Sequence, residues 1–178
     1  MPDRRTELAD AALAVVAAKG LKGLTHRAVD AQAGVAVGTT SNYFRNRAAL
    51  VSAAVDRVEE RDTLLLQQDG WETPTSVAAL ADQLTGALMG LALENADLTR
   101  ARFAFALDQP EVVAAGHERM LAGLTHILGF LKVPDARARA ESVADYGDGL
   151  AMHLLTARKG QDIDRATVAR NIQRLLEG

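Results

Sequence analysis

The apolar residues in the first part of the chain recur every three or four positions, which is the spacing of one face of an α-helix. Thr25 stands where a side chain can cap a helix, and Gly34 has the backbone freedom that a sharp turn needs. The pattern predicts a helix-turn-helix, in which a tight turn joins two short helices. In this region the predicted helices cover residues 6–19, 26–33, 37–44 and 47–66.

Helical spacing continues after a predicted loop over residues 67–75, which contains Asp69, Gly70 and Pro74. No segment alternates as a strand would, so we expect an all-α fold. We expect a three-helix helix-turn-helix domain over residues 1–47 and a second helical domain over residues 48–178. In the second domain the predicted helices cover residues 76–94, 98–107, 111–131, 136–157 and 165–177.

The composition excludes several classes of function. The 178 residues include no cysteine, so disulfides, thiolate metal sites and a cysteine nucleophile are excluded. His117 and His126 stand nine positions apart on different helix faces, and we expect neither a metal site nor a cofactor. No nucleophile motif or phosphate-binding loop is present, so we expect no enzymatic activity. The start lacks a signal peptide and no long uncharged apolar run follows, so we expect a cytoplasmic protein without a membrane partner.

Charge is divided unequally along the chain. Residues 1–47 carry a net charge of +3, whereas residues 48–178 carry −6. A basic N-terminal segment followed by an acidic remainder is typical of a modular DNA-binding protein. A chance distribution of a few charges is the alternative.

Residues 25–50, THRAVDAQAGVAVGTTSNYFRNRAAL, carry a resemblance to a known family. They have a Thr-x-Arg start, Ala-Gly-Val at the turn, a Gly-Thr pair, an aromatic pair ending at Phe44, and basic Arg47 at the start of the next helix. In order and spacing, residues 4–50 resemble the DNA-binding core of the TetR family of transcriptional regulators. The resemblance implies a homodimeric, ligand-responsive repressor whose second domain binds a small molecule and forms the dimer.

The expected DNA contacts lie on the second and third helices and at the residues that flank them. By spacing, the outer face or start of the third helix carries Val37, Gly38, Thr39, Ser41, Asn42 and Tyr43, which a recognition helix would present to the major groove. By resemblance, Arg27 contacts a guanine and Tyr43 occupies an aromatic contact position. Phosphate-contact positions of the family correspond to Thr25, His26, Ser41 and Arg47.

Three residues depart from the family pattern. Ala36 stands where the family has a Ser-like cap for the recognition helix, so that the helix start is expected to be weaker. Asp30 stands where a small packed residue is usual, and its carboxylate is expected to turn outward or find a basic partner. Ser41 replaces a common tyrosine, which shortens the reach toward a phosphate.

The last two helices are expected to form the dimer interface, as the resemblance implies. Both carry apolar stripes, and the alternative is that these stripes pack only within one subunit. The residues expected at the interface are Val143, Gly147, Leu150, Leu154, Val168, Ile172 and Leu175. A dimer would place two recognition helices about 34 Å apart and would bind a palindromic operator.

A pocket for a small hydrophobic or aromatic effector is expected among the middle helices, although core packing is the commoner role for such side chains. Its expected walls are Met89, Leu93, Phe103, Leu107, Met120, Leu124 and Tyr146, with His117 as a polar contact. Trp71 is expected to be either a lid or a surface residue. An activator, a non-inducible regulator of the same fold and a protein-binding adaptor remain alternatives to an inducible repressor.

Overall fold

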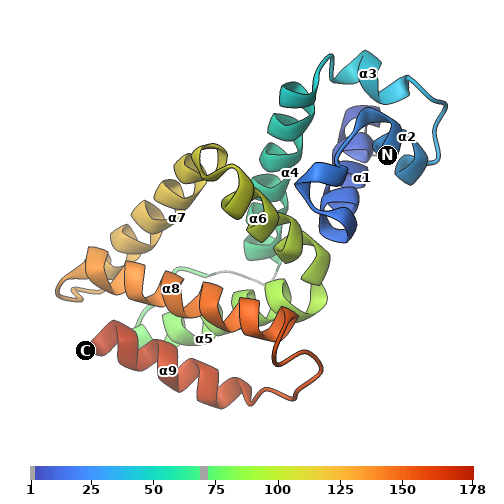
Figure 1. Cartoon of the computed structure of the whole chain (residues 1–178). Coiled ribbons are helices and arrows are strands. Elements are labelled where there is room, and N and C mark those ends of the chain that lie inside the picture. The colour runs from blue at the N-terminus through green and yellow to red at the C-terminus, as the bar shows by residue number, and fades with distance from the viewer. Residues whose placement is uncertain (1–2, 69–71) are drawn as a thin grey trace. The chain divides into compact units, whose positions relative to one another are not determined.

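The computed structural model describes residues 3–68 and 72–178, and within these residues the secondary structure is entirely helical (Figure 1). The predicted all-α fold with an N-terminal helix-turn-helix is confirmed. The elements are α1 (Arg4–Lys19), the 3₁₀ helix η1 (Leu21–Gly23), α2 (His26–Ala33), α3 (Thr39–Tyr43), α4 (Arg47–Gln68), α5 (Val77–Met89), the π-helical η2 (Gly90–Glu94), α6 (Ala96–Asp108), α7 (Pro110–Phe130), α8 (Ala136–Leu155) and α9 (Arg165–Glu177).

The helix boundaries lie within two residues of the predicted ones except in the helix expected over residues 76–94, and at two places the backbone conformation explains the difference. The third helix begins at Thr39 rather than at residue 37, because Gly38 has a φ of 94° and cannot be part of a right-handed helix. The helix expected over residues 76–94 is α-helical only as far as Met89 and then widens into a π-helical turn. Trp71, expected as a lid or surface residue, lies outside the described residues.

The chain divides into two compact units, which we call the head unit and the body unit. The head unit comprises residues 1–64 and 96–114, and the body unit comprises residues 65–95 and 115–178. The head unit therefore contains α6 and most of α4 in addition to the three helices expected there.

In the head unit, α1 packs against both α2 and α6. Its buried face includes Leu8 and Val16, and the aromatic rings of Phe44 and Phe105 are fully buried in the same unit. Burying a large apolar side chain contributes about 1.5–3 kcal/mol, so these contacts are the main source of stability in the head unit.

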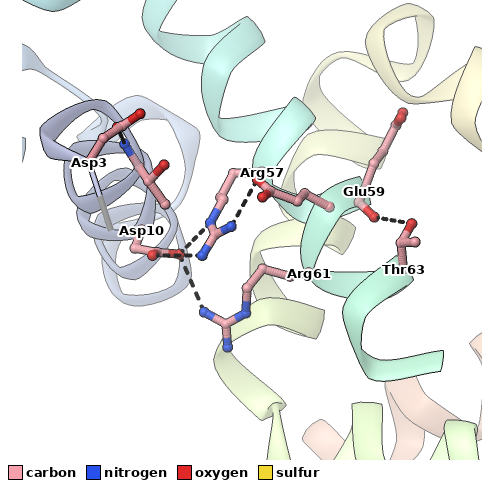
Figure 2. Close-up of polar contacts among 8 residues, drawn as sticks. Asp3, Asp10, Arg57, Glu59, Arg61 and Thr63 are labelled. Carbon is pink, nitrogen blue, oxygen red and sulfur yellow. Dashed lines mark hydrogen bonds and ion pairs between the residues drawn. The ribbon is translucent and has the colours of Figure 1, made fainter. Parts of the chain in front are cut away.

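Ion pairs also connect the elements of the head unit. Arg57 of α4 donates two hydrogen bonds to Asp10 of α1, at 2.8 and 2.9 Å, and Arg61 reaches the same carboxylate at 3.3 Å (Figure 2). The hydrogen bonds to Asp10 raise the pKa of Arg57. Arg102 of α6 pairs with Asp62 of α4, and the pKa of Asp62 is nevertheless raised because burial of its carboxyl outweighs that pairing. These ion pairs connect α4 to α1 and to α6.

In the body unit, α9 packs along α5 and α8. Its buried side chains, Val168, Ile172 and Leu176, are three and four positions apart and so share one face of the helix. One described stretch, Val77–Glu94, has the length and mean hydropathy of a membrane-spanning helix, by length and composition only. A single such helix is weak evidence for a membrane span, because core helices of globular proteins have the same properties.

Candidate nucleic-acid interface

The turn between α2 and α3 is built by local sequence signals. Thr25 caps α2, since its hydroxyl accepts a hydrogen bond of 3.1 Å from the Ala28 amide. Gly34 ends α2 in the left-handed region, with a φ of 66°, and the Val35 amide returns to the Asp30 carbonyl at 3.0 Å. These bonds fix the direction in which the chain leaves α2.

The outer face of α3 is available to a ligand. Val37 is 82% exposed just before the helix and Tyr43 is 42% exposed at its end. Ser41 and Asn42 are also exposed, whereas Thr39 is half-buried. The hydroxyl groups of Thr39 and Ser41 each donate to a carbonyl three residues earlier, and their oxygens can still accept bonds from a ligand.

The Asp30 carboxylate does not have the surroundings that were expected from the sequence. It neither turns outward nor pairs with a basic residue but is 2% exposed. It accepts hydrogen bonds from the Gly38 amide at 2.7 Å, the Thr40 amide at 2.7 Å and the Thr40 hydroxyl at 2.5 Å. Burial raises the pKa of Asp30, but the bonds from Thr40 and Gly38 outweigh burial and bring the pKa below its usual value.

The carbonyl end of α3 is bound by basic side chains. His26 Nε2 lies 2.6 Å from the Phe44 carbonyl oxygen and must carry the proton for that hydrogen bond. The Arg5 guanidinium lies 4.8 Å from the centre of the Phe44 ring and donates to the Tyr43 carbonyl at 3.4 Å. A carboxylate at one end of α3 and basic groups at the other agree with the direction of the helix dipole.

The two predicted arginine contacts differ in their surroundings. Arg27 is exposed on α2. Arg47 is also exposed, but its Nη2 donates to the Leu21 carbonyl at 2.9 Å, so part of its guanidinium already binds the chain. Thr25, His26 and Arg47 therefore have internal partners in addition to their expected role at phosphates.

Sequence reasoning missed the internal roles of Asp30 and Arg5. A signal for Asp30 was available, because a carboxylate at a buried position and a missing hydroxyl at Ala36 occur in the same motif. The two departures from the family pattern are connected, because the Asp30 carboxylate supplies the bonds that a serine at position 36 would have supplied in part.

Comparisons with known proteins agree with this geometry. Residues 8–54 match the family model described as "Bacterial regulatory proteins, tetR family". The match spans the helix-turn-helix and the start of α4, the same segment that carries the expected DNA contacts. Residues 8–54 are therefore a helix-turn-helix domain of the TetR family.

Other known proteins extend the likeness beyond the matched segment. The chain is 22% identical over 165 residues to the HTH-type transcriptional regulator PksA of Bacillus subtilis, which covers 85% of this chain and 78% of the relative. A TetR-family structure from Streptomyces coelicolor is 25% identical, with a TM-score of 0.73 and coverage of 98% and 99%. The multidrug binding protein EbrR, crystallised with malachite green, is 24% identical, with a TM-score of 0.75 and coverage of 98% and 99%. The likeness in fold to these proteins therefore extends over nearly the whole chain.

The residues expected to line an effector pocket fall in both units of the chain. Phe103 and Leu107 belong to the head unit and the other six to the body unit. Leu107 is 77% exposed, and Leu93 and Met120 are about half exposed. Met89, Phe103 and Tyr146 are half-buried, Leu124 is buried and His117 is exposed.

Two further features concern possible ligand sites. A cavity of about 340 Å³ lies in the head unit, between the first turns of α4 and the start of α7, and none of the eight predicted pocket residues lines it. Among the described residues no group of three or more His, Asp or Glu side chains could hold a metal ion.

The residues expected at the dimer interface are mostly core residues of one chain. Five of them are no more than 9% exposed: Val143, Leu150, Leu154, Val168 and Ile172. Gly147 and Leu175 are half-buried. Packing within one subunit, the alternative for these stripes, is therefore what the structure shows for the five buried side chains.

Proposed function

We propose that this TetR-family regulator is a homodimeric repressor that binds a palindromic operator through α3 and leaves it when a small hydrophobic or aromatic effector binds. The observation that carries the proposal is the exposed face of α3. Ser41, Asn42 and Tyr43 project from a helix that is fixed at both ends, as direct readout of base edges requires, and Val37 is exposed just before that helix.

In the proposed complex, some side chains determine the sequence specificity and others the affinity for DNA. Arg27, exposed on α2, hydrogen-bonds a guanine, and the α3 face contacts neighbouring bases. Thr25, His26, Ser41 and Arg47 contact phosphates, together with the Gly38 backbone and Thr39 at the helix start. Because phosphate contacts carry no sequence information, they set position and strength rather than preference.

A mobility-shift assay tests the DNA-binding step. The probes are DNA fragments from upstream of the gene and an unrelated fragment of equal length, at several salt concentrations. We expect a salt-sensitive shift with an upstream fragment. Arg27→Ala should reduce the preference for the operator, whereas Arg47→Ala should weaken binding to both fragments alike. Equal binding of both fragments by the unaltered protein would contradict the proposal.

The proposed dimer uses the outer faces of α8 and α9, since the apolar stripes of these helices are largely buried within the chain. Gly147 and Leu175 are half-buried and remain available at the edge of those faces. Gly149 is exposed on α8, and a side chain there would meet nothing within 4 Å in one chain.

Gly149→Arg is therefore a direct test of the dimer. It should leave the fold intact and convert the protein to a monomer in sedimentation velocity. Gly129→Arg is the matched control, because Gly129 is an equally open, exposed helical glycine on α7. Dissociation by both variants or by neither would contradict the proposed interface.

The proposed effector class rests on a relative as well as on the apolar side chains. EbrR structures are described as complexes with imidazole, ethidium and malachite green. Ethidium and malachite green are therefore suitable first probes. We expect either compound to release the operator from this protein, and Tyr146→Phe and Met120→Ala to change the concentration required. Tighter DNA binding in the presence of the compound would favour a co-repressor or activator scheme instead.

A dimeric repressor of this kind acts in the cytoplasm, where the DNA is, and requires no cofactor or membrane partner. Release needs a coupling free energy of only about 1–3 kcal/mol between the effector and DNA sites. In the head unit, α6 packs directly on α1 and is ion-paired to α4 through Arg102 and Asp62. These contacts give the proposed effector signal a physical route to the DNA-binding helices.

A further inference from the structure

The recognition helix of this protein is too short to maintain its own position. α3 has five residues, Thr39–Tyr43, and starting a helix is unfavourable before several hydrogen bonds have formed. Its first amides have no partner within the helix. No side chain local to the helix start caps it, because position 36 is an alanine and the N-cap residue, Gly38, has no side chain.

Asp30 supplies the missing bonds from the neighbouring helix. One carboxylate oxygen, Oδ2, accepts from the Gly38 amide at 2.7 Å, and the other, Oδ1, accepts from the amide and hydroxyl of Thr40. Thr40 is fully buried and Asp30 is 2% exposed, so water does not compete for these bonds. The two oxygens therefore hold two points of the α3 start at a fixed distance from α2.

The charge of Asp30 strengthens this arrangement. Hydrogen bonds to an ionised acceptor are roughly twice as strong as those between neutral groups. A negative charge at the start of a helix is also stabilised by the helix dipole. The lowered pKa of Asp30 agrees with a carboxylate that is ionised at neutral pH.

We propose that Asp30 is a positioning residue for DNA recognition: by fixing the start of α3 against α2, it sets the orientation in which residues 37–43 meet the base edges. The inference rests on the proposed function, because it requires α3 to be the recognition helix. Its consequence is specific. Loss of Asp30 should reduce discrimination between operator and unrelated DNA more than it reduces general affinity for DNA.

Asp30→Ala and Asp30→Asn test the inference, with Val29→Ala as the matched control. Val29 is adjacent on α2 and fully buried, so its truncation destabilises the same unit without removing a bond to α3. Competition binding would measure the ratio of operator affinity to unrelated-DNA affinity. We expect Asp30→Ala to reduce this ratio about 10- to 100-fold, since hydrogen bonds to charged groups are lost. Val29→Ala should leave the ratio unchanged even where it lowers the melting temperature more.

Asp30→Asn should give an intermediate loss, because the amide oxygen can still accept from Thr40 while the amide nitrogen would face the Gly38 donor. Adding Ala36→Ser to Asp30→Ala should recover part of the ratio, because a serine hydroxyl can cap the same helix start. The same serine in the unaltered protein should change little, because the Gly38 and Thr40 amides are already bonded.

Hydrogen exchange gives a second measurement that does not depend on DNA. The amides of Gly38 and Thr40 should be protected in the unaltered protein and lose protection in Asp30→Ala, while the amides of α1 keep theirs. Equal loss of the affinity ratio in Asp30→Ala and Val29→Ala would overturn this inference and leave the proposed function intact. An unaltered protein that shows no preference among DNA fragments would overturn the proposed function, and the inference with it.

Discussion

The head unit and the body unit hold their functional elements in place by different interactions. In the head unit, α3 is fixed by directional bonds, from Asp30 at one end and His26 at the other. In the body unit, α9 is held along α5 and α8 by a buried apolar face, and its bond from Arg165 to Asp82 is exposed. Directional bonds specify one arrangement, whereas apolar packing tolerates many substitutions of similar volume. The difference explains why a short motif identifies the head and why the body has no comparable motif.

The largest expected effects come from the cores of the two units. Phe44→Ala removes a ring that is 1% exposed, and we expect it to cost about 3–5 kcal/mol of unfolding free energy. Urea denaturation would measure the total loss, and hydrogen exchange would locate it. Because Phe44 belongs to the head unit, the amides of α3 should lose protection and those of α9 should keep it.

Ile172→Ala is the reciprocal variant in the body unit. Ile172 is 1% exposed on α9, and its truncation should cost about 2–5 kcal/mol and deprotect α9 and α5. Equal loss of protection in α3 and α9 after either substitution would mean that the two units unfold as one. That result would contradict separate stabilisation of the head unit and the body unit.

The sequence predicted the head unit more completely than the body unit. The Thr25 cap and the Gly34 turn are local signals, so the helix-turn-helix was predicted with nearly correct boundaries. The bonds of Asp30 to Gly38 and Thr40, and of Arg57 to Asp10 47 positions away, depend on tertiary approach and leave no periodic trace. Expecting Asp30 to face solvent or a basic group was therefore wrong, because backbone amides were not considered as partners.

The body unit shows a second limit of sequence reasoning. An apolar stripe identifies a buried helix face but not the surface that buries it. The stripes of α8 and α9, expected at a dimer interface, are largely covered within the chain, so the contact surface between two chains stays a prediction. The eight pocket residues likewise remain predictions, because helical spacing cannot show whether side chains from separate helices converge.

Acid titration tests how much the charge of Asp30 contributes to the stability of the head unit. Because its pKa is lowered in the folded protein, its stabilising contribution is present above the unfolded-state pKa and is lost as the pH falls through the folded-state value. At neutral pH, Asp30→Asn should cost about 1.5–3 kcal/mol. The difference in unfolding free energy between the unaltered protein and the variant should shrink in acid, as measured by denaturation at a series of pH values. A difference that stays constant down to the acid limit would contradict an ionised role.

A smaller loss of unfolding free energy is expected when Gly38 is replaced, because of its backbone conformation. Its φ of 94° suits glycine, and an alanine there should cost about 1–2 kcal/mol although its Cβ would meet nothing within 4 Å. Gly129→Ala is the control in the body unit, where an open helical glycine should gain about 0.5–1 kcal/mol on substitution. Thermal unfolding would measure both variants. Opposite signs would support the view that position 38 requires glycine for its left-handed backbone, and equal signs would contradict it.

The smallest effect is expected at the exposed ion pairs of the body unit. Arg137 of α8 lies 2.6 Å from Glu118 of α7 and 2.7 Å from Glu141, yet its side chain is 44% exposed. Water and salt screen such pairs, so Arg137→Ala should leave the unfolding midpoint and DNA affinity unchanged. Arg57→Ala is the contrasting variant, since the Arg57 side chain is 12% exposed and binds Asp10 through two bonds. It should lower the midpoint measurably, and a larger loss from Arg137→Ala would mean that charge, and not burial, decides what these pairs contribute.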